Sequence, residues 1–370
     1  MKKNRKSSIS AQESMYVATQ WQLMFRRFRK HTLAQIGFWV LVILFSCAIF
    51  SEIISPHDMA KRDTKSILSA PTPVHFMHNG KFIGPFVYGM KMVEDPVTWK
   101  KSYVEDTEAV HKIGLFVKGD PYKMWGLISG DRHLFGTVDK APFFPFGTDG
   151  SGRDLFSRII GGLRVSLTIG LVGVFFTFVL GCMFGGIAGY YGGMTDIIVS
   201  RICEFLSSMP SIPLWMALAA AMPKEWNTLQ IYLMITIILS LIGWTGLART
   251  VRGKLFQLRE EDYVLAAKLS GAKDSYIIAK HLLPGFMSYL IVSITLSVPG
   301  MILSETSLSF LGIGLRPPIV SLGVLLKDAQ NVNTIAISPW LLIPGIFIII
   351  TVLAFNFLGD GMRDAADPYK

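Results

Sequence analysis

Residues 165–190 read VSLTIGLVGVFFTFVLGCMFGGIAGY and contain no charged side chain. The hydrocarbon core of a bilayer is about 30 Å thick, and a helix needs roughly 20 apolar residues to cross it. Within lipid every backbone amide has to be satisfied inside its own segment, so an apolar run of this length is expected to be a helix. The sequence therefore predicts an all-α integral membrane protein.

Further apolar stretches bring the predicted number of transmembrane helices to about six. The predicted spans are Leu33 to Ile54, Val165 to Tyr190, Ile197 to Met222, Leu229 to Leu247, Gly285 to Gly314 and Trp340 to Leu358. Prolines predict a break in the third span, at 207–213, and another in the fifth, near Pro299-Gly300, because proline removes a backbone donor and clashes with the preceding turn. The sixth span is expected to end at Gly359-Asp360-Gly361.

The formal net charge of +10 lies largely beside the predicted spans. Basic residues precede the first span and follow the fourth, at Lys2, Lys3, Arg5, Lys6, Arg26, Arg27, Arg29 and Lys30, and at Arg249, Arg252, Lys254 and Arg259. Lysine and arginine mark the cytoplasmic flanks of membrane spans, so this charge indicates topology rather than nucleic-acid binding. We expect cytoplasmic segments at 1–32 and 359–370, in a multi-pass protein of a bacterial plasma membrane. The three cysteines lie in apolar stretches and are interpreted as packing residues.

Residues 55–160 contain no apolar run long enough to cross a membrane. With the N-terminus inside, this segment is expected outside, because long loops translocate largely regardless of their charge. Turn signals at Asn79-Gly80, Gly119-Asp120-Pro121 and Gly130-Asp131 predict a small, partly β extracellular insert. The five remaining spans then form the predicted membrane core at 161–358.

The polar segment at about 259–284, between the fourth and fifth spans, reads REEDYVLAAKLSGAKDSYIIAKHLLP. Its acidic start suits the positive N-terminal end of a helix. Gly271 can end that helix, because glycine adopts a left-handed turn without strain. Asp274 or Ser275 can cap a second helix, and Pro284 suits the first turn of the fifth span. The segment therefore predicts two short helices joined by a hinge.

The first of these helices has a flat side and apolar projections. Ala266 and Ala267 make the flat side, while Tyr263, Val264 and Leu269 project from the helix. Such a helix can dock in a groove of a partner protein or rest on the membrane surface. The residues alone leave both interpretations open.

The same segment resembles the coupling motif of binding-protein-dependent ABC importer permeases. The resemblance rests on Ala266-Ala267, on Gly271 after three intervening residues, and on His281-Leu282-Leu283-Pro284 after nine more. Leu265 and His281 replace the acidic residue and the isoleucine that are usual there, and both departures are common in the peptide and nickel branch. In this family the loop inserts into a cleft of the ATPase subunit. The coupling residues that the resemblance implies are Tyr263, Val264, Leu265, Ala266, Ala267, Leu269, Gly271, Ala272, His281 and Pro284.

Further matches resemble the oligopeptide and dipeptide branch, in particular its "C" permease. They lie at 146–158 (FGTDGSGRDLFSR), 162–167, 189–193, 304–314 and 359–368. The resemblance implies a type I ABC importer permease fold and import of oligopeptides or dipeptides by alternating access. It implies as partners a second homologous permease, two ATPases that bind ATP and Mg, and an extracellular peptide-binding protein. The chain has no Walker phosphate loop, so no cofactor is expected on it.

Polar residues inside predicted spans are candidates for the translocation path, because an ionisable group in hydrocarbon is costly unless it faces water or a partner. The candidates are Glu204, Ser207, Ser208, Pro210, Ser304 and Glu305. For Glu204 we favour a structural pair with Arg201, three residues earlier on the same helix face. Glu305 has no obvious local partner, which favours the path or a subunit interface.

Two other transport functions are alternatives. A nickel or other small-solute importer of the same build would show a histidine cluster. His75 and His78 are close in sequence, but such pairs on loops are usually solvated, so no metal site is predicted. An ATP-independent channel or secondary transporter would show internal repeats, and no clear repeat is found. No catalytic set is visible, so the chain is not predicted to be an enzyme.

Overall fold

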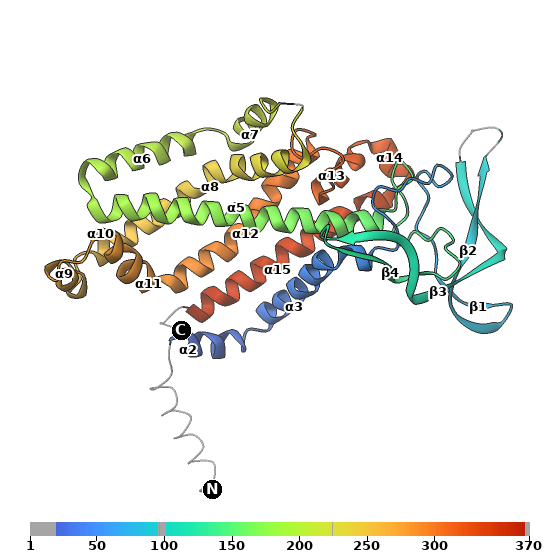
Figure 1. The fold of residues 1–370 in the computed structure, drawn as a ribbon, viewed down its shortest axis with the longest axis horizontal. Coiled ribbons are helices and arrows are strands. Elements are labelled where there is room, and N and C mark those ends of the chain that lie inside the picture. Colours follow the sequence, from blue (N-terminus) through green and yellow to red (C-terminus); the bar gives the residue numbers. More distant parts are fainter. Residues whose placement is uncertain (1–19, 95, 97–100, 224, 367–370) are drawn as a thin grey trace, which may run out of the picture.

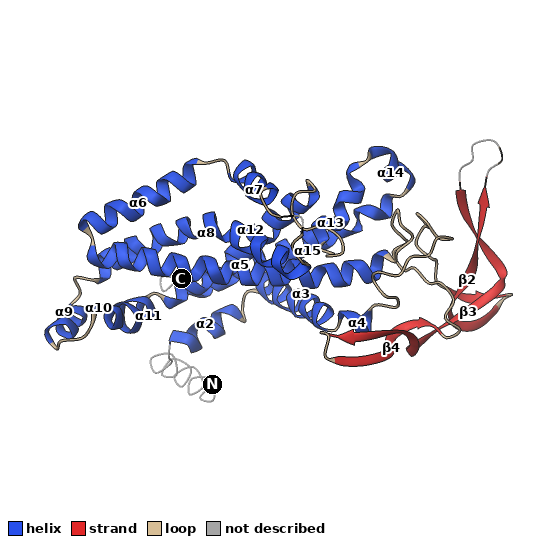
Figure 2. Ribbon diagram, turned by 45° about the horizontal axis from the view of Figure 1, so that its top comes forward, coloured by secondary structure: helices blue, strands red, loops and turns tan. Residues whose placement is uncertain are grey.

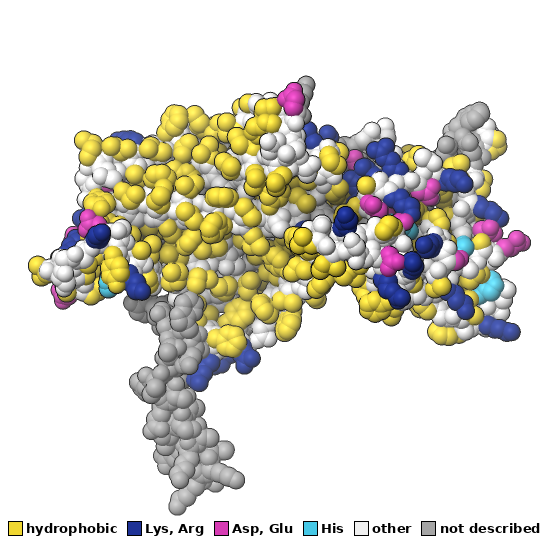
Figure 3. All heavy atoms as spheres, in the orientation of Figure 1, with side chains coloured by type: hydrophobic (Ala, Val, Ile, Leu, Met, Phe, Trp, Pro, Cys, Tyr) yellow, Lys and Arg dark blue, Asp and Glu magenta, His cyan; other side chains and the backbone are white. Residues whose placement is uncertain are grey.

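The computed structural model describes residues 20–94, 96, 101–223 and 225–366. A bundle of long helices carries a β-sheet at one end and a group of short helices at the other (Figure 1). Among the described residues, five helices are long and apolar enough to cross a membrane. They are α3 (Thr32–Ile49), α5 (Leu155–Tyr191), α8 (Thr228–Leu258), α12 (Met287–Phe310) and α15 (Ile343–Ala366). Their apolar side chains form a belt in Figure 3, and charged side chains gather at both ends of the molecule.

The third predicted span is a bent pair of helices, α6 (Gly193–Ser208) and α7 (Ser211–Ala220), which meet at 86°. Met209 is extended at the bend, and Pro210 precedes the first turn of α7. Proline cannot donate the backbone hydrogen bond that would continue the helix. The predicted break is confirmed, and the bundle has six spans if the pair counts as one.

The predicted break in the fifth span is wrong, because α12 continues through Pro299. This helix lies close along α5. A Cβ atom at Gly170 would lie 2.8 Å from Ile302, and one at Gly173 would lie 3.0 Å from Met301. A proline removes only one backbone hydrogen bond, and close packing against a neighbouring helix keeps the segment continuous.

The predicted end of the sixth span is also wrong, because α15 continues to Ala366. Its glycines allow close contact with neighbouring helices instead. A Cβ atom at Gly361 would lie 2.1 Å from the Cβ of Ala34 on α3, and one at Gly359 would lie 2.4 Å from Leu296 on α12. Small residues at these positions let the helices approach.

The sheet has four antiparallel strands in the order β1-β2-β3-β4. The strands are β1 (His75–His78), β2 (Lys81–Glu94), β3 (Lys101–Met124) and β4 (Ile128–Thr137). The first half of β3 pairs with β2 and its second half pairs with β4. Figure 2 shows the strands set apart from the helical bundle. The strands expected between the first two spans are therefore present.

Only one of the three predicted turns joins two strands. Asn79 and Gly80 have φ values of 49° and 77° between β1 and β2. The segment Gly119-Asp120-Pro121 lies inside β3, where the register with β4 shifts, and Gly130-Asp131 lies inside β4. The turn that joins β3 to β4 instead contains Trp125 and Gly126, with φ values of 53° and 73°.

Buried polar contacts join the sheet to the bundle. His133 on β4 is 2% exposed, and its Nε2 lies 2.9 Å from the carbonyl oxygen of Asp120. Its Nδ1 contacts the carbonyl oxygen of Ser55, which follows the short helix α4 (Ser51–Ile54). Trp125 donates from Nε1 to the carbonyl oxygen of Ile49 at the end of α3, over 3.1 Å.

The segment 146–158, which precedes and opens α5, satisfies its charges internally. Asp149 accepts hydrogen bonds from the backbone N–H groups of Ser151 and Arg153, at 2.8 and 3.0 Å. Its carboxylate also binds the side chains of Arg153 and Arg158, and Arg158 is 2% exposed. Asp154 caps α5 by accepting from the N–H of Ser157 over 2.9 Å. This cluster fixes the entry of the chain into its longest helix.

Short helices occupy both ends of the bundle. They are α2 (Gln20–Phe28), α9 (Asp262–Leu269), α10 (Asp274–Tyr276), the π-helix η1 (Ile277–Leu282), α11 (Leu283–Gly285), α13 (Leu322–Lys327), η2 (Asp328–Gln330), α14 (Val332–Ile337) and η3 (Pro339–Leu342). In Figures 1 and 2, α2 and the group α9–α11 lie at the end opposite the sheet, while α13 and α14 lie nearer to it.

Candidate functional site

The predicted pair of short helices is present between α8 and α12. Helix α9 begins at Asp262, directly after Glu260 and Glu261, and ends at Leu269, with Ser270 as its C-cap. Gly271 has a φ of 78°, and the N–H of Ala272 donates to the carbonyl oxygen of Ala267 over 3.1 Å. A Cβ atom at Gly271 would meet nothing within 4 Å, so only its left-handed backbone conformation favours glycine there.

One side of α9 is anchored in the bundle. Val264 is completely buried, in a cluster with Leu255 of α8 and with Ile277, Leu282 and Phe286, which follow α9 in the chain. Ala267 and Ala272 pack against the same cluster. Burial of such side chains fixes the position of α9 relative to the membrane helices.

The other side of α9 is open. Leu269 is 90% exposed, and Tyr263 and Leu265 are 44% and 46% exposed. Ala266 is exposed beside them. Partial burial and the charge of Glu261 raise the pKa of Tyr263 above its ordinary value. A short helix held firmly on one side and apolar on the other has the form of a docking element.

Tyr190 at the end of α5 holds the second half of the segment, a role that its sequence motif did not reveal. Its hydroxyl donates to the carboxylate of Asp274 over 2.7 Å, and the Lys268 ammonium lies 4.7 Å from its ring centroid. The prediction that Asp274 or Ser275 caps the second helix is therefore wrong, since the backbone makes no capping bond with either side chain.

His281 and Pro284 lie beyond this hinge. His281 is half-buried in the π-helix η1, with its ring centroid 5.5 Å from that of Tyr276. Pro284 lies in α11, and α12 begins only at Met287. The expectation that Pro284 lies in the first turn of the fifth span is thus wrong, because a short, separate helical turn contains Pro284 and precedes the span. A proline suits the start of that turn because its missing N–H has no partner there.

Three of the predicted pathway residues lie where α6 meets α7 and α8. The hydroxyl of Ser207 lies 3.2 Å from that of Thr245 and accepts from Arg249 over 3.1 Å. Ser208 donates to the carbonyl oxygen of Phe205 over 2.8 Å. Pro210 is exposed at the bend. The bend therefore exposes polar groups within an apolar segment.

The expectation for Glu204 is confirmed, and the expectation for Glu305 is not. Glu204 accepts from Arg201 over 2.7 Å. Glu305 is completely buried, and its carboxylate contacts the hydroxyls of Ser309, Ser321 and Ser166, at 2.7, 2.7 and 3.2 Å. These partners come from three parts of the same chain, so Glu305 joins them inside the bundle and does not face an open path. The sequence alone does not reveal Ser166 and Ser321 as partners, because both lie far from Glu305 along the chain.

Ser304 belongs to a small and polar face of α12 that sequence analysis missed. The face is formed by Ser293, Ser297, Gly300, Ser304 and Ser307. Each is at least partly exposed, and a Cβ atom at Gly300 would meet nothing within 4 Å. Their spacing of three or four residues, which places them on one side of a helix, was the available signal.

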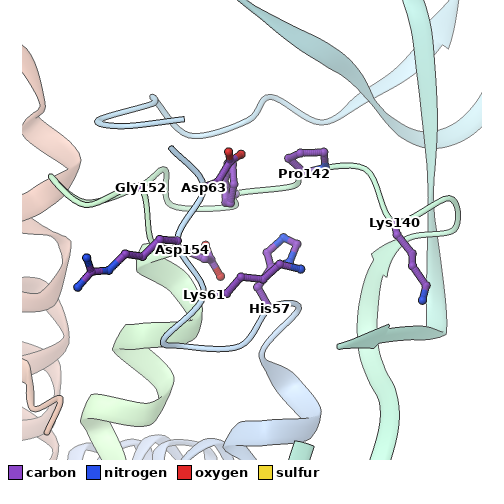
Figure 4. A pocket seen from close by; sticks show the side chains of 9 residues that line it. His57, Lys61, Asp63, Lys140, Pro142, Gly152 and Asp154 are labelled. Atoms are coloured by element: carbon purple, nitrogen blue, oxygen red, sulfur yellow. The ribbon is translucent and has the colours of Figure 1, made fainter. Parts of the chain in front are cut away.

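A cavity of about 260 Å³ lies at the sheet end, between the segment after α4 and the segment before α5 (Figure 4). His57, Lys61 and Asp154 are among the residues that line it. Asp154 caps α5, and Lys61 binds Asp120 over 2.8 Å. These charges are used within the chain, so the cavity is part of the junction between sheet and bundle. Among the described residues, no group of three or more histidine, cysteine or acidic side chains has the arrangement of a metal site.

Comparison with known proteins settles which family the chain belongs to. The sequence profile of a family described as "binding-protein-dependent transport system inner membrane component" matches residues 181–369. The chain is also 32% identical over 369 residues to the dipeptide transport system permease protein DppC of Bacillus subtilis, covering 99% of this chain and 90% of that relative. The chain belongs to the binding-protein-dependent transport permeases. A second profile, described as the "N-terminal TM domain of oligopeptide transport permease C", matches residues 19–71 of the permease.

Two further matches describe the permease's relatives. It is 42% identical over 224 residues to the oligopeptide transport system permease protein OppC of Haemophilus influenzae, covering 60% of the permease and 70% of that relative. Among solved structures, a chain of the inward-facing MetNI methionine ABC transporter aligns with a TM-score of 0.43 and 20% identity, over 56% of the permease and 96% of that chain. The alignment with DppC of Bacillus subtilis spans nearly the whole permease, so it includes the segment that forms the sheet.

Membership in the family confirms the main expectations from the sequence. The permease is a multi-pass inner-membrane protein with a type I ABC importer permease fold. It is a translocation component rather than a catalytic subunit, and it works in a transport complex with ATPase and binding-protein partners.

Proposed function

We propose that the permease carries oligopeptides or dipeptides across the inner membrane. Support comes from its relatives, which are named as dipeptide and oligopeptide permeases and include one that covers nearly the whole chain. In this proposal the permease pairs with a second, homologous permease, and two ATPase subunits bind ATP and Mg and supply the driving force. The permease itself holds no cofactor, and an extracellular peptide-binding protein delivers the substrate.

The observation that carries the proposed coupling to the ATPases is the two-sided burial of α9. Val264 is completely buried in the bundle, while Leu269 is 90% exposed. A groove on the ATPase that covers Leu269, Leu265 and Tyr263 would bury apolar surface at no cost to the permease's own packing. Movement of that groove on ATP binding would pass through Val264 into the bundle, because Val264 belongs to the same buried cluster as Leu255 of α8.

The same arrangement supports an orientation in the membrane. The α9–α11 group, α2 and the last turns of α15 lie at one end of the bundle, and the sheet lies at the other (Figure 1). Basic residues flank the bundle at the α9 end, including Arg29, Lys30 and Arg259. By the positive-inside rule this end is cytoplasmic. The sheet then lies outside, where the binding protein arrives.

The polar faces of α12 and α6 are the proposed lining of the path. Ser304 and its neighbours on α12 expose hydroxyls and small side chains within the apolar belt. The bend beside Ser207, Ser208 and Pro210 offers further polar groups. A second permease facing these surfaces would enclose a polar passage whose ends open alternately. Glu204 keeps its pair with Arg201 at the edge of this region.

The test of this proposal is the substitution Leu269→Asp in the complete transporter. We expect co-purification of the ATPase and ATP-driven uptake of a labelled dipeptide to fall at least tenfold, since a carboxylate would be buried without a partner. Leu127→Asp is the matched control, because Leu127 is 86% exposed at the sheet end. Retention of the ATPase by both variants alike would overturn the docking role of α9.

A further inference from the structure

Helix α2 encloses an apolar groove with the ends of two membrane helices. The groove has a volume of about 350 Å³ and is lined by Met24, Phe25 and Phe28 of α2, Phe38 of α3, and Leu358, Met362 and Ala365 of α15. All of these side chains are apolar, and the volume lies within the range of about 300–1,000 Å³ that is typical of ligand pockets. The groove is separate from α9 and from the polar face of α12.

Contacts beneath the groove fix its shape. Gly361 of α15 lies against Ala34 of α3, where a Cβ atom would come within 2.1 Å. His31 caps α3 by accepting from the N–H of Ala34 over 3.2 Å, and its other ring nitrogen lies 3.7 Å from Asp364. The two membrane helices are thus held together at this level, and α2 lies beside the end of α15 (Figure 1). The groove is a preformed feature of the fold.

The groove is open to its surroundings. Phe25 is 56% exposed and Phe38 is 42% exposed. Exposed aromatic side chains cost free energy in water, and hydrocarbon that covers them removes that cost. The groove lies at the edge of the apolar belt, where α3 begins and α15 ends. Lipid acyl chains are available at this depth.

The rim of the groove is basic. The segments that form the groove carry Arg26, Arg27, Arg29, Lys30 and Arg363, against the carboxylates of Asp360 and Asp364, and His31 lies beside Asp364. The Arg29 guanidinium lies 4.8 Å from the ring centroid of Phe25, so this charge sits directly above the apolar lining. An excess of positive charge beside an apolar groove is complementary to a phosphate attached to an acyl chain.

We infer that this groove is a binding site for an anionic phospholipid, with an acyl chain along Phe25, Phe28 and Met362 and the phosphate against Arg29 and Lys30. The inference depends on the membrane location of the chain and not on its substrate. Two signals act together in this site, apolar burial and charge, which is the combination that gives stable association with a lipid. The acyl chain of a zwitterionic phospholipid would fill the groove, but its headgroup has no net charge to complement the basic rim.

Photo-crosslinking in the complete transporter tests this site. The probe is phosphatidylglycerol with a diazirine in one acyl chain, incorporated in phosphatidylcholine nanodiscs, and peptide mass spectrometry locates the adducts. We expect adducts concentrated on the peptides that contain Met24 and Met362. Excess unlabelled phosphatidylglycerol should lower their yield about tenfold, and excess phosphatidylcholine should not.

Charge reversal distinguishes the contribution of the basic rim to lipid binding from that of the apolar groove. We expect the double variant Arg29→Glu, Lys30→Glu to lower the adduct yield at Met24 and Met362 about tenfold, since each basic residue near an anionic headgroup adds to binding. The matched control is Lys254→Glu, Lys280→Glu, which reverses two exposed lysines away from the groove and should change nothing. Monodisperse elution of both variants checks that they fold.

Three results would overturn the inference. Adducts spread over the whole apolar belt would show a general lipid contact, and equal competition by phosphatidylcholine would show that charge is irrelevant. Adducts at Met24 that appear only after deletion of residues 1–19 would show that the chain's own N-terminal segment occupies the groove.

Discussion

The segments 146–158 and 259–284 both resemble the same family of transport proteins, yet they differ in the burial of their characteristic side chains. In the first, the charges of Asp149 and Arg158 are buried against each other. In the second, Val264 is buried while Leu269 is left 90% exposed. A motif whose groups are satisfied within the chain builds the fold, whereas a motif that leaves apolar side chains outside is available to a partner. Burial of the individual side chains separates the two roles, and sequence resemblance does not.

The largest effect is expected from Asp149→Ala. The substitution leaves the buried guanidinium of Arg158 without its carboxylate, and breaking a buried ion pair from one side costs about 3–5 kcal/mol. Thermal unfolding of the purified permease measures the loss. Asp131→Ala is the matched control, because Asp131 pairs with Lys118 on the exposed surface, where water and salt screen the interaction and little stability is lost. Equal losses of stability in the two variants would show that the ion pair in 146–158 contributes no more to the fold than an exposed pair does.

A second pair of variants compares the buried side and the exposed side of α9. Val264→Ala should destabilise the permease by about 1–3 kcal/mol, because it removes methyl groups from a completely buried position. Leu269→Ala should change the free energy of unfolding by less than about 0.5 kcal/mol, because the leucine is almost fully exposed. Thermal unfolding again provides the measurement. Comparable losses would mean that both sides of α9 are packed in the isolated chain.

The smallest effect concerns pH at the sheet junction. Burial opposes ionisation of Asp120, but its hydrogen bond with the Lys61 ammonium is decisive and holds the pKa of Asp120 below its ordinary value. A carboxyl group with a lowered pKa stabilises the fold above the pKa of the unfolded chain, about 3.9, and this contribution is lost as pH falls through the folded pKa. Lys61→Met should therefore be less stable than the parent by about 0–1 kcal/mol at pH 7, and the difference should shrink as pH falls below about 3.9. A difference that does not change with pH would contradict the ionic origin.

Much of the architecture follows from local sequence alone. The length of 165–190 identifies a membrane helix, Pro210 marks the bend between α6 and α7, and Gly271 marks the end of α9, because each of these depends on nearby residues only. Prediction fails where distant segments meet. Pro299 does not break α12, and Gly361 does not end α15, because both helices pack tightly against helices far away in the sequence.

The same distinction applies to the candidate site. The two-sided character of α9 is visible in its sequence, but the choice of which side is buried depends on Leu255 in α8 and on Phe286, which directly precedes α12. Glu305 was expected at a path because two of its serine partners, Ser166 and Ser321, lie far from it along the chain. Tyr190 lies in the matched segment 189–193, and only the fold shows its bond with Asp274.

The most direct test of the central claim uses the accessibility of residue 269. In a permease whose native cysteines, Cys47, Cys182 and Cys203, are replaced by alanine, Leu269→Cys should react quickly with a soluble maleimide in the isolated chain. In the assembled transporter the rate should fall at least tenfold, while Leu127→Cys at the sheet end keeps its rate. An unchanged rate at residue 269 in a complex shown to contain the ATPase would contradict the docking of α9.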